Sequence, residues 1–166
     1  MRARRLQGWD SVYTRGPDGV IESDERITLT RPVVAWTSAG ARELGERYWN
    51  EVGRATLGLV RMLELREGSE LRLRLVGASL LRFGRAELAA GEDSVTCRFP
   101  IRGGVLAKER AGALVLSQSG DETPQLRAAL TGFVPRLGSR PYDQIQRRVH
   151  VAISRRFFRR LLEERR

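Results

Sequence analysis

The clearest hydrophobic pattern lies at the end of the chain, in residues 141–166. Apolar residues recur there at spacings of three or four, which places them on one stripe of a helix with 3.6 residues per turn. The stretch has no internal glycine, and its one proline stands where a first helical turn tolerates it. The pattern predicts one long helix whose apolar stripe consists of Tyr142, Ile145, Val149, Ile153, Phe157 and Leu161.

Residues 57–137 follow a period of two, which is typical of strands. Leucine and arginine alternate strictly in residues 71–75, and turn-forming residues separate the apolar runs. Residues 26–31 alternate in the same way, and Ser38 can cap a helix that ends near residue 56. This order predicts an α+β fold. In it, a curved antiparallel sheet of about six to seven strands grips the long C-terminal helix, with a shorter helix after the first strand.

The length of 166 residues predicts a single domain over residues 1–166, with an N-terminal arm (1–25) and the closing helix (141–166). One cysteine, Cys97, excludes an internal disulfide and a cysteine-based zinc site, and one histidine, His150, excludes a histidine-rich metal site. We therefore expect no metal and no cofactor. The start of the chain lacks the apolar run of a signal peptide, and no stretch approaches the roughly 20 apolar residues that span a bilayer. A cytoplasmic location is expected.

The formal net charge of +10 is concentrated at the two ends of the chain. Residues 1–15 hold four arginines against one acid, and residues 140–166 hold nine arginines against three acids. Basic ends attract nucleic acid or an anionic membrane, although a solvated helix face explains them as well. Aromatic residues are not interleaved with the basic ones on the strands, so nucleic acid is the less expected partner. Peripheral membrane contact stays open.

Two segments carry a resemblance to a known family: FPIRGGVLAKERAGALVLSQSGDETPQLRAALTGFVPRL (residues 99–137) and QRRVHVAISRRFFRRL (residues 146–161). With the order of elements, they resemble the START-like superfamily of polyketide cyclases and lipid-transport proteins (SRPBCC), which has the helix-grip fold. The resemblance covers about residues 26–162 at the level of pattern. A lipocalin-like barrel is the alternative, and the helix that precedes the strands fits it less well.

The resemblance implies that an apolar small molecule binds in a cavity between the sheet and the C-terminal helix. A strongly bent sheet cannot lie flat on a straight helix, so a gap that bulky side chains leave unfilled becomes a pocket. Plain core packing explains the same residues. Arg156 and Arg160 lie close to the apolar stripe, and each either extends to solvent or binds an anionic head group of the ligand. The candidate ligand-binding residues are Tyr48, Trp49, Leu73, Phe83, Phe99, Leu130, Phe133, Val149, Ile153, Arg156 and Phe157.

Only His150 is suited by type to near-neutral acid–base chemistry, and Tyr48 is a second candidate for proton transfer. They allow an alternative function, a cyclase- or dehydratase-type enzyme that uses the same cavity. A half-exposed helix histidine explains His150 equally simply, and no nucleophile with a base partner is evident. The sequence leaves open whether the protein is an enzyme.

A second, smaller stripe follows the far side of the last helix and consists of Val151, Phe158 and Leu162. Three exposed apolar residues at this spacing predict a homodimer contact or a membrane surface. In the alternative arrangement, the N-terminal arm covers them through Trp9 or Tyr13. A third function class, a basic-helix interaction module for nucleic acid or membrane, depends on the same helix.

Overall fold

The computed structural model describes residues 8–65, 70–75, 78–108, 112–120, 123–136 and 147–163. The side chains of residues 63–65, 70, 71, 73, 75 and 78 lie outside this description. The described part contains two helices and nine strands. They are β1 (Asp10–Arg15), β2 (Ile21–Thr28), α1 (Ser38–Ala55), β3 (Val60–Leu65), β4 (Glu70–Leu75), β5 (Ala78–Gly84), β6 (Glu87–Ala90), β7 (Ser94–Gly103), β8 (Ala113–Ser119), β9 (Gln125–Phe133) and α3 (Arg147–Glu163).

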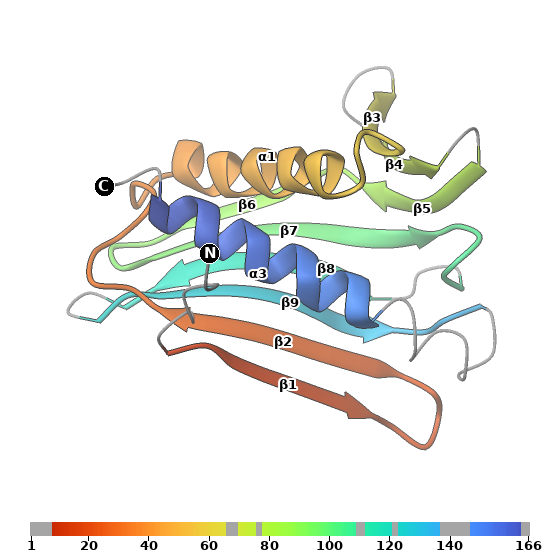
Figure 1. Ribbon diagram of the computed structural model, residues 1–166, viewed down its shortest axis with the longest axis horizontal. Coiled ribbons are helices and arrows are strands. Elements are labelled where there is room, and N and C mark those ends of the chain that lie inside the picture. The colour runs from red at the N-terminus through yellow and green to blue at the C-terminus, as the bar shows by residue number, and fades with distance from the viewer. Residues whose placement is uncertain are drawn as a thin grey trace.

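The strands form one antiparallel sheet in the order β1-β2-β9-β8-β7-β5-β4-β3, with β6 beside β7 (Figure 1). The predicted α+β class, the curved antiparallel sheet, the early helix and the C-terminal helix are confirmed. The described sheet has more strands than expected, because residues of the N-terminal arm form β1 and the short segment Glu87–Ala90 forms β6. The strand predicted at residues 26–31 instead runs from Ile21 to Thr28.

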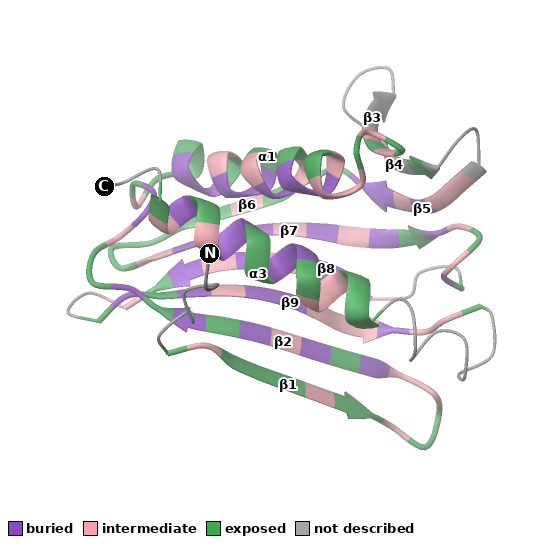
Figure 2. Ribbon diagram, viewed as in Figure 1, coloured by how far each residue is buried: buried purple, intermediate pink, exposed green. Residues whose placement is uncertain are grey.

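Both helices cover the same face of the sheet and run in opposite directions (Figure 1). α1 packs on β6, β7 and β8, whereas α3 packs on α1 and β2. Each helix turns its buried residues toward the sheet, and the buried residues of β2 alternate with exposed ones (Figure 2). Neither described helix is long and apolar enough to cross a bilayer. The helix layer is therefore shared between two helices, which leaves a seam between them.

α1 begins one residue earlier than the sequence suggested, because its cap is Thr37 and not Ser38. The Thr37 hydroxyl oxygen accepts a hydrogen bond from the Gly40 amide at 3.2 Å. Further along, Gly45 permits a close approach to β7. A Cβ at this position would lie 2.9 Å from both Cys97 Sγ and Phe99 Cζ. The glycine that weakens the helix in isolation thus allows α1 to pack tightly on the sheet.

The segment between β2 and α1 is held by one buried side chain, Gln118 of β8. Its amide oxygen accepts hydrogen bonds from the backbone N–H groups of Val33 and Val34 at 2.6 and 3.1 Å. Its Nε2 donates to the carbonyl of Val34 at 2.9 Å. The side chain supplies the partners that a neighbouring strand would otherwise provide, and so fixes the approach of the chain to α1.

Candidate binding site between the two helices

The interior beneath α1 is filled by aromatic rings. The Trp49 ring centroid lies 5.3 Å from those of both Phe83 and Phe99, and the two phenylalanines are 6.3 Å apart. Phe83 and Phe99 are buried, and Trp49 is partly buried against the same core. Three residues predicted to line a ligand cavity therefore contact one another.

A second row of rings runs from α1 to the N-terminal segment. Phe157 of α3 lies between Tyr48, at 5.4 Å, and Phe158, at 5.6 Å. Phe158 contacts Trp9 edge-on at 5.5 Å, and the Arg155 guanidinium lies 5.5 Å above the Trp9 ring. Trp9 thus covers Phe158, in agreement with the alternative in which the N-terminal arm covers the second stripe. A homodimer through Val151, Phe158 and Leu162 stays a prediction.

The remaining predicted lining residues differ in their surroundings. Phe133 and Ile153 are buried, and Leu130 is partly buried against the same core. Val149 is 46% exposed, and the Leu73 side chain lies outside the described ones. The residues on α3 that face the core are Ile153, Ser154, Phe157, Phe158 and Leu161.

The inward face of α3 includes polar residues that hydrophobic periodicity does not register. His150 and Ser154 are one helical turn apart, and Ser154 is completely buried. The pattern placed Val149 at this level of the helix because valine is apolar and histidine is not. At the N-terminal end of α3, the inward-facing residue is therefore His150 and not Val149, one position further along the chain.

Tyr48 of α1 and His150 of α3 meet across the seam. The Tyr48 Oη and His150 Nδ1 atoms lie 3.5 Å apart, a long hydrogen bond whose direction depends on the histidine tautomer. Burial lowers the pKa of His150 to about 4 and raises the pKa of Tyr48. Both side chains are therefore neutral at pH 7. A neutral pair of this kind is a poor proton shuttle at that pH, and the proposed catalytic roles of both residues stay predictions.

A buried carboxylate, Glu25 of β2, faces the same interior. Its Oε1 accepts hydrogen bonds from Ser11 at 2.9 Å and Ser23 at 3.3 Å. Its Oε2 is buried and has no hydrogen-bond partner among the described atoms. Burial raises the pKa of Glu25 against the opposing effect of the two serines, and nearby Asp24 raises it further.

These groups converge on Tyr48. Besides burial, the negative charge of Glu25 raises the pKa of Tyr48, and the nearby hydroxyl of Ser154 lowers the pKa of Tyr48. The Ser154 hydroxyl is nevertheless too poorly placed for a hydrogen bond of ordinary geometry, and His150 Nε2 is likewise buried without a partner in the described part of the chain. Because such atoms are costly to bury, the interior beneath α3 retains unused hydrogen-bonding capacity.

An ion pair closes the seam above this polar interior. Arg156 Nε donates to Glu51 Oε1 at 2.9 Å, and the Glu51 side chain is only 3% exposed whereas that of Arg156 is 56% exposed. The second oxygen of Glu51 has no partner among described atoms. Arg156 thus links α3 to α1, and its predicted contact with a ligand head group stays a prediction.

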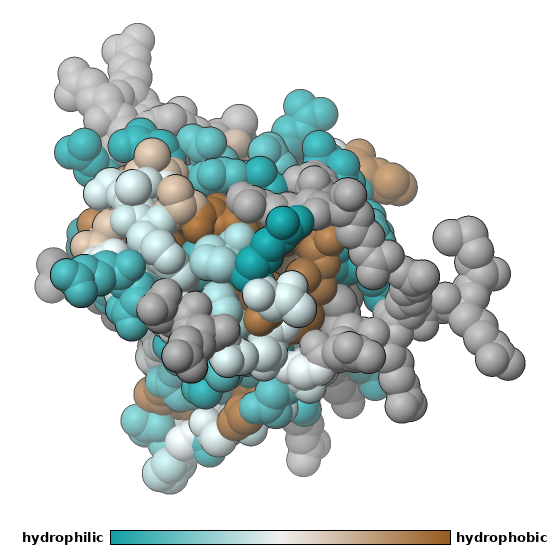
Figure 3. Space-filling view, turned by 90° about the vertical axis from the view of Figure 1, so that its left-hand side faces the viewer, coloured by the Kyte–Doolittle hydropathy of each residue, from teal (hydrophilic) through white to brown (hydrophobic). Residues whose placement is uncertain are grey.

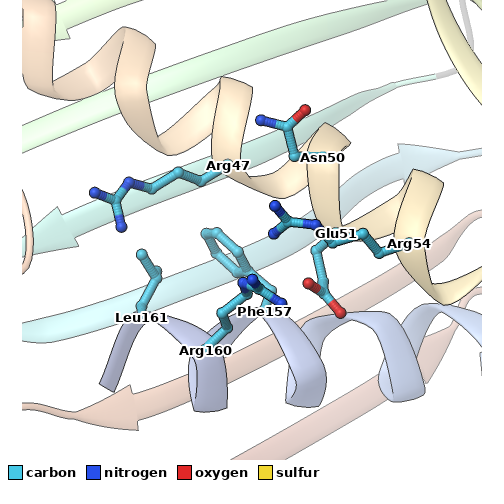
Figure 4. Close-up of a pocket in the computed structure, with 7 residues that line it drawn as sticks. All are labelled: Arg47, Asn50, Glu51, Arg54, Phe157, Arg160 and Leu161. Atoms are coloured by element: carbon cyan, nitrogen blue, oxygen red, sulfur yellow. The ribbon is translucent and has the colours of Figure 1, made fainter. Parts of the chain in front are cut away.

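A hollow of about 120 Å³ lies beside this ion pair. Figure 4 shows three guanidinium groups, those of Arg47, Arg54 and Arg160, pointing toward the space between the helices. Phe157 and Leu161 supply its apolar surface. Arg47 also pairs with Glu43 on its own helix at 2.6 Å. The hollow is lined by Arg47, Asn50, Glu51, Arg54, Phe157, Arg160 and Leu161, and we call these residues the seam groove.

The seam groove combines positive charge with an apolar floor. Guanidinium groups bind carboxylate and phosphate through paired hydrogen bonds, and an apolar floor accommodates a short hydrocarbon part. The volume is below the 300–1,000 Å³ typical of sites for drug-sized molecules, so it suits a small anion or a head group. On the face seen in Figure 3, the described apolar side chains form small areas between polar ones, without one wide apolar opening.

Of the groove residues, sequence reasoning had singled out Phe157 as a ligand contact and Arg160 as one possible partner of an anionic head group. The signal for the others was present on α1, where Arg47, Asn50, Glu51 and Arg54 follow at helical spacing beside the apolar stripe. Their meaning depends on which face of α1 meets α3, and periodicity alone does not specify that. Among the described residues, no group of three or more histidine, cysteine, aspartate or glutamate side chains is placed to hold a metal ion.

No protein-family model matches the chain, and neither does any curated protein. CalU16 from Micromonospora echinospora is a solved structure with partial similarity. It is 16% identical, the match covers 74% of this chain and 68% of that chain, and the TM-score is 0.36. Another is CyanoP, the cyanobacterial PsbP from Synechocystis sp. PCC 6803. It is also 16% identical, with 89% of this chain and 80% of that chain covered and a TM-score of 0.36. Similarity at this level carries no functional argument, and membership of the START-like superfamily stays a prediction.

Proposed function

We propose that the protein binds a small amphipathic anion in the seam groove, with its carboxylate or phosphate toward the arginines and its apolar part against Phe157 and Leu161. The observation that carries the proposal is the convergence of Arg47, Arg54 and Arg160 on an apolar floor between α1 and α3. As in the sequence-based prediction, the proposed ligand would contact the C-terminal helix, here through Phe157, Arg160 and Leu161.

The proposal modifies the ligand expected from the sequence. A wholly apolar guest between sheet and helix would occupy space that Trp49, Phe83 and Phe99 share among themselves in the described interior. An anion with a short apolar part needs less room and uses the charge of the groove. The side-chain amide of Asn50 offers a hydrogen-bond donor at its side, and the Glu51 carboxylate is paired with Arg156.

The test compares two probes of nearly equal shape, hexanoate and hexanamide, by isothermal titration calorimetry. Both carry the same hydrocarbon part, so tighter binding of hexanoate isolates the contribution of charge. Hexyl phosphate extends the series to a phosphate head. We expect hexanoate and hexyl phosphate to bind and hexanamide to bind at least about tenfold more weakly, as hydrogen bonds to charged groups contribute more.

A matched pair of variants locates the site. Arg54→Gln removes one groove guanidinium and should weaken hexanoate binding about tenfold. Arg42→Gln removes an exposed arginine on the same helix that does not line the groove, and should leave binding unchanged. Equal binding of hexanoate and hexanamide, or equal behaviour of the two variants, would contradict the proposal.

A further inference from the structure

Glu51 of α1 is a buried carboxylate that borders the seam groove. Its side chain is only 3% exposed, and it lines the hollow together with Arg54 and Phe157. Its Oε1 accepts a hydrogen bond from Arg156 Nε at 2.9 Å, whereas its Oε2 has no hydrogen-bond partner among the described atoms. Leaving a buried oxygen without a donor costs free energy. Oε2 is therefore the atom of the groove that most needs a donor from a ligand.

This carboxylate lies between two arginines on one face of α1. Arg47, Glu51 and Arg54 follow one another at spacings of four and three residues, which brings their side chains together on the helix surface. Figure 4 shows the Glu51 carboxylate extending from α1 toward α3, beside the space that the Arg54 guanidinium also enters. The groove thus presents a negative group next to a positive one.

The two opposite charges distinguish between classes of small carboxylate. A simple carboxylate such as hexanoate meets the guanidinium of Arg54, but it brings a second negative charge close to Glu51. A ligand with an ammonium beside its carboxylate avoids this repulsion, and its N–H groups are donors for Glu51 Oε2. In an α-amino acid the two groups are attached to the same carbon atom. They match side chains that are three residues apart on one helix, which are close neighbours.

Ion pairs within the chain are compatible with this arrangement. Arg47 pairs with Glu43 at 2.6 Å, and Arg156 is bonded to the other oxygen of Glu51. We therefore assign the carboxylate of the ligand to Arg54 and its ammonium to Glu51 Oε2. Neither assignment requires Arg47 or Arg160 to lack a partner within the chain.

We propose that the ligand of the seam groove is an α-amino acid with an aliphatic side chain. Its ammonium donates to Glu51, its carboxylate accepts from Arg54, and its side chain lies against Phe157 and Leu161. The inference rests on the proposed function, because it specifies that the bound carboxylate belongs to a zwitterion.

Three probes with the same number of carbon atoms test the inference by isothermal titration calorimetry of the full chain. Norleucine is hexanoate with an ammonium on the α carbon, and 6-aminohexanoate is its isomer with the ammonium at the far end. We expect norleucine to bind at least about tenfold more tightly than hexanoate, since hydrogen bonds between charged groups are the stronger ones. 6-Aminohexanoate should bind more weakly than both, because its ammonium would lie against the apolar floor.

The variant Glu51→Gln isolates the contribution of the carboxylate. Its amide oxygen can still accept from Arg156, and a thermal melt checks that the variant is folded. We expect it to lose the preference for norleucine and to bind hexanoate more tightly than the parent chain does, because the repulsion is removed. Glu46→Gln removes an exposed carboxylate on the same helix that does not line the groove, and should keep the preference.

The results separate this inference from the proposed function. If hexanoate binds and norleucine binds no more tightly, the inference is wrong and the groove is a site for simple anions. If folded Glu51→Gln keeps the full preference for norleucine, Glu51 is not the partner of the ammonium and the inference is again wrong. If neither hexanoate nor norleucine binds, the proposed function fails together with the inference.

Discussion

The interiors beneath the two helices differ, although both helices cover the same face of one sheet. Beneath α1, Gly45 brings the helix close to β7, and Trp49, Phe83 and Phe99 contact one another. Beneath α3, Glu25 and Ser154 are completely buried and retain polar atoms without partners in the described part of the chain. The α1 side has one such atom among its rings, the Trp49 indole nitrogen. Each of these atoms costs free energy, so the two sides differ in the groups they bury: aromatic rings prevail beneath α1, and a carboxylate, a hydroxyl and an imidazole lie beneath α3.

The largest expected effect comes from Phe157, which belongs to both regions. It is buried, contacts Tyr48 and Phe158, and forms the floor of the seam groove. Phe157→Ala should lower the free energy of unfolding by about 3–5 kcal/mol, measured by urea denaturation. A loss below about 1 kcal/mol would mean that the rings at the seam are not closely packed, and the contrast between the two sides would lose its basis.

Acid should weaken the α3 side through His150. Its pKa is lowered from 6.5 to about 4 in the fold, so between these pH values the unfolded chain binds a proton that the folded protein does not. Stability contributed by the neutral imidazole is thus complete above pH 6.5 and falls as the pH falls, by about 3 kcal/mol at pH 4. Urea denaturation across this range measures the slope.

The variant His150→Leu isolates this effect from that of other titrating groups. Its free energy of unfolding should depend less on pH between 6.5 and 4 than that of the parent chain, by about one proton. Identical slopes for both proteins would show that His150 titrates normally and is not enclosed beneath α3.

A pair of glycine variants probes the α1 side. Gly45→Ala should destabilise the protein, because the new Cβ would lie too close to Cys97 and Phe99. The cost of this overpacking should exceed the gain in helix propensity. Gly53→Ala, in the same helix, meets nothing closer than the Val60 carbonyl oxygen at 4.0 Å and should stabilise by up to about 1 kcal/mol. Thermal unfolding of both variants decides the sign. Equal stabilisation by both would mean that α1 does not approach β7 closely.

The smallest effect concerns Glu25. Because its pKa is raised by burial, the folded state disfavours the charged form, and the contribution to stability decreases as the pH rises through the titration. Glu25→Gln keeps an oxygen to accept from Ser11 and should stabilise the protein at pH 7 by up to about 1 kcal/mol. If the variant is instead less stable at pH 7 by urea denaturation, the carboxylate is favourably paired in the fold.

Sequence patterns specified the elements better than the site. The apolar stripe with Ile153, Phe157 and Leu161 correctly predicted the C-terminal helix, because burial of one helix face imposes a regular spacing. The same spacing could not identify His150 and Ser154 as inward residues, since their burial is maintained at a cost and not driven by hydrophobicity.

The seam groove could not be predicted from the sequence for a different reason. Arg47 and Arg54 are far along the chain from Arg160, and only the packing of α1 against α3 brings them together. Gly45 illustrates the same limit, because it weakens an isolated helix and its benefit depends on β7. Contacts between elements escaped prediction more than the elements themselves, of which β1 and β6 were not expected.

The central claim is that a small anion binds in the seam groove and not among the rings beneath α1. Intermolecular nuclear Overhauser effects from the methylene protons of bound hexanoate test this most directly. We predict contacts with the Phe157 ring and the Leu161 methyl groups. Contacts with Phe83 and Phe99 instead, or none with any aromatic or leucine side chain at saturating hexanoate, would contradict the claim.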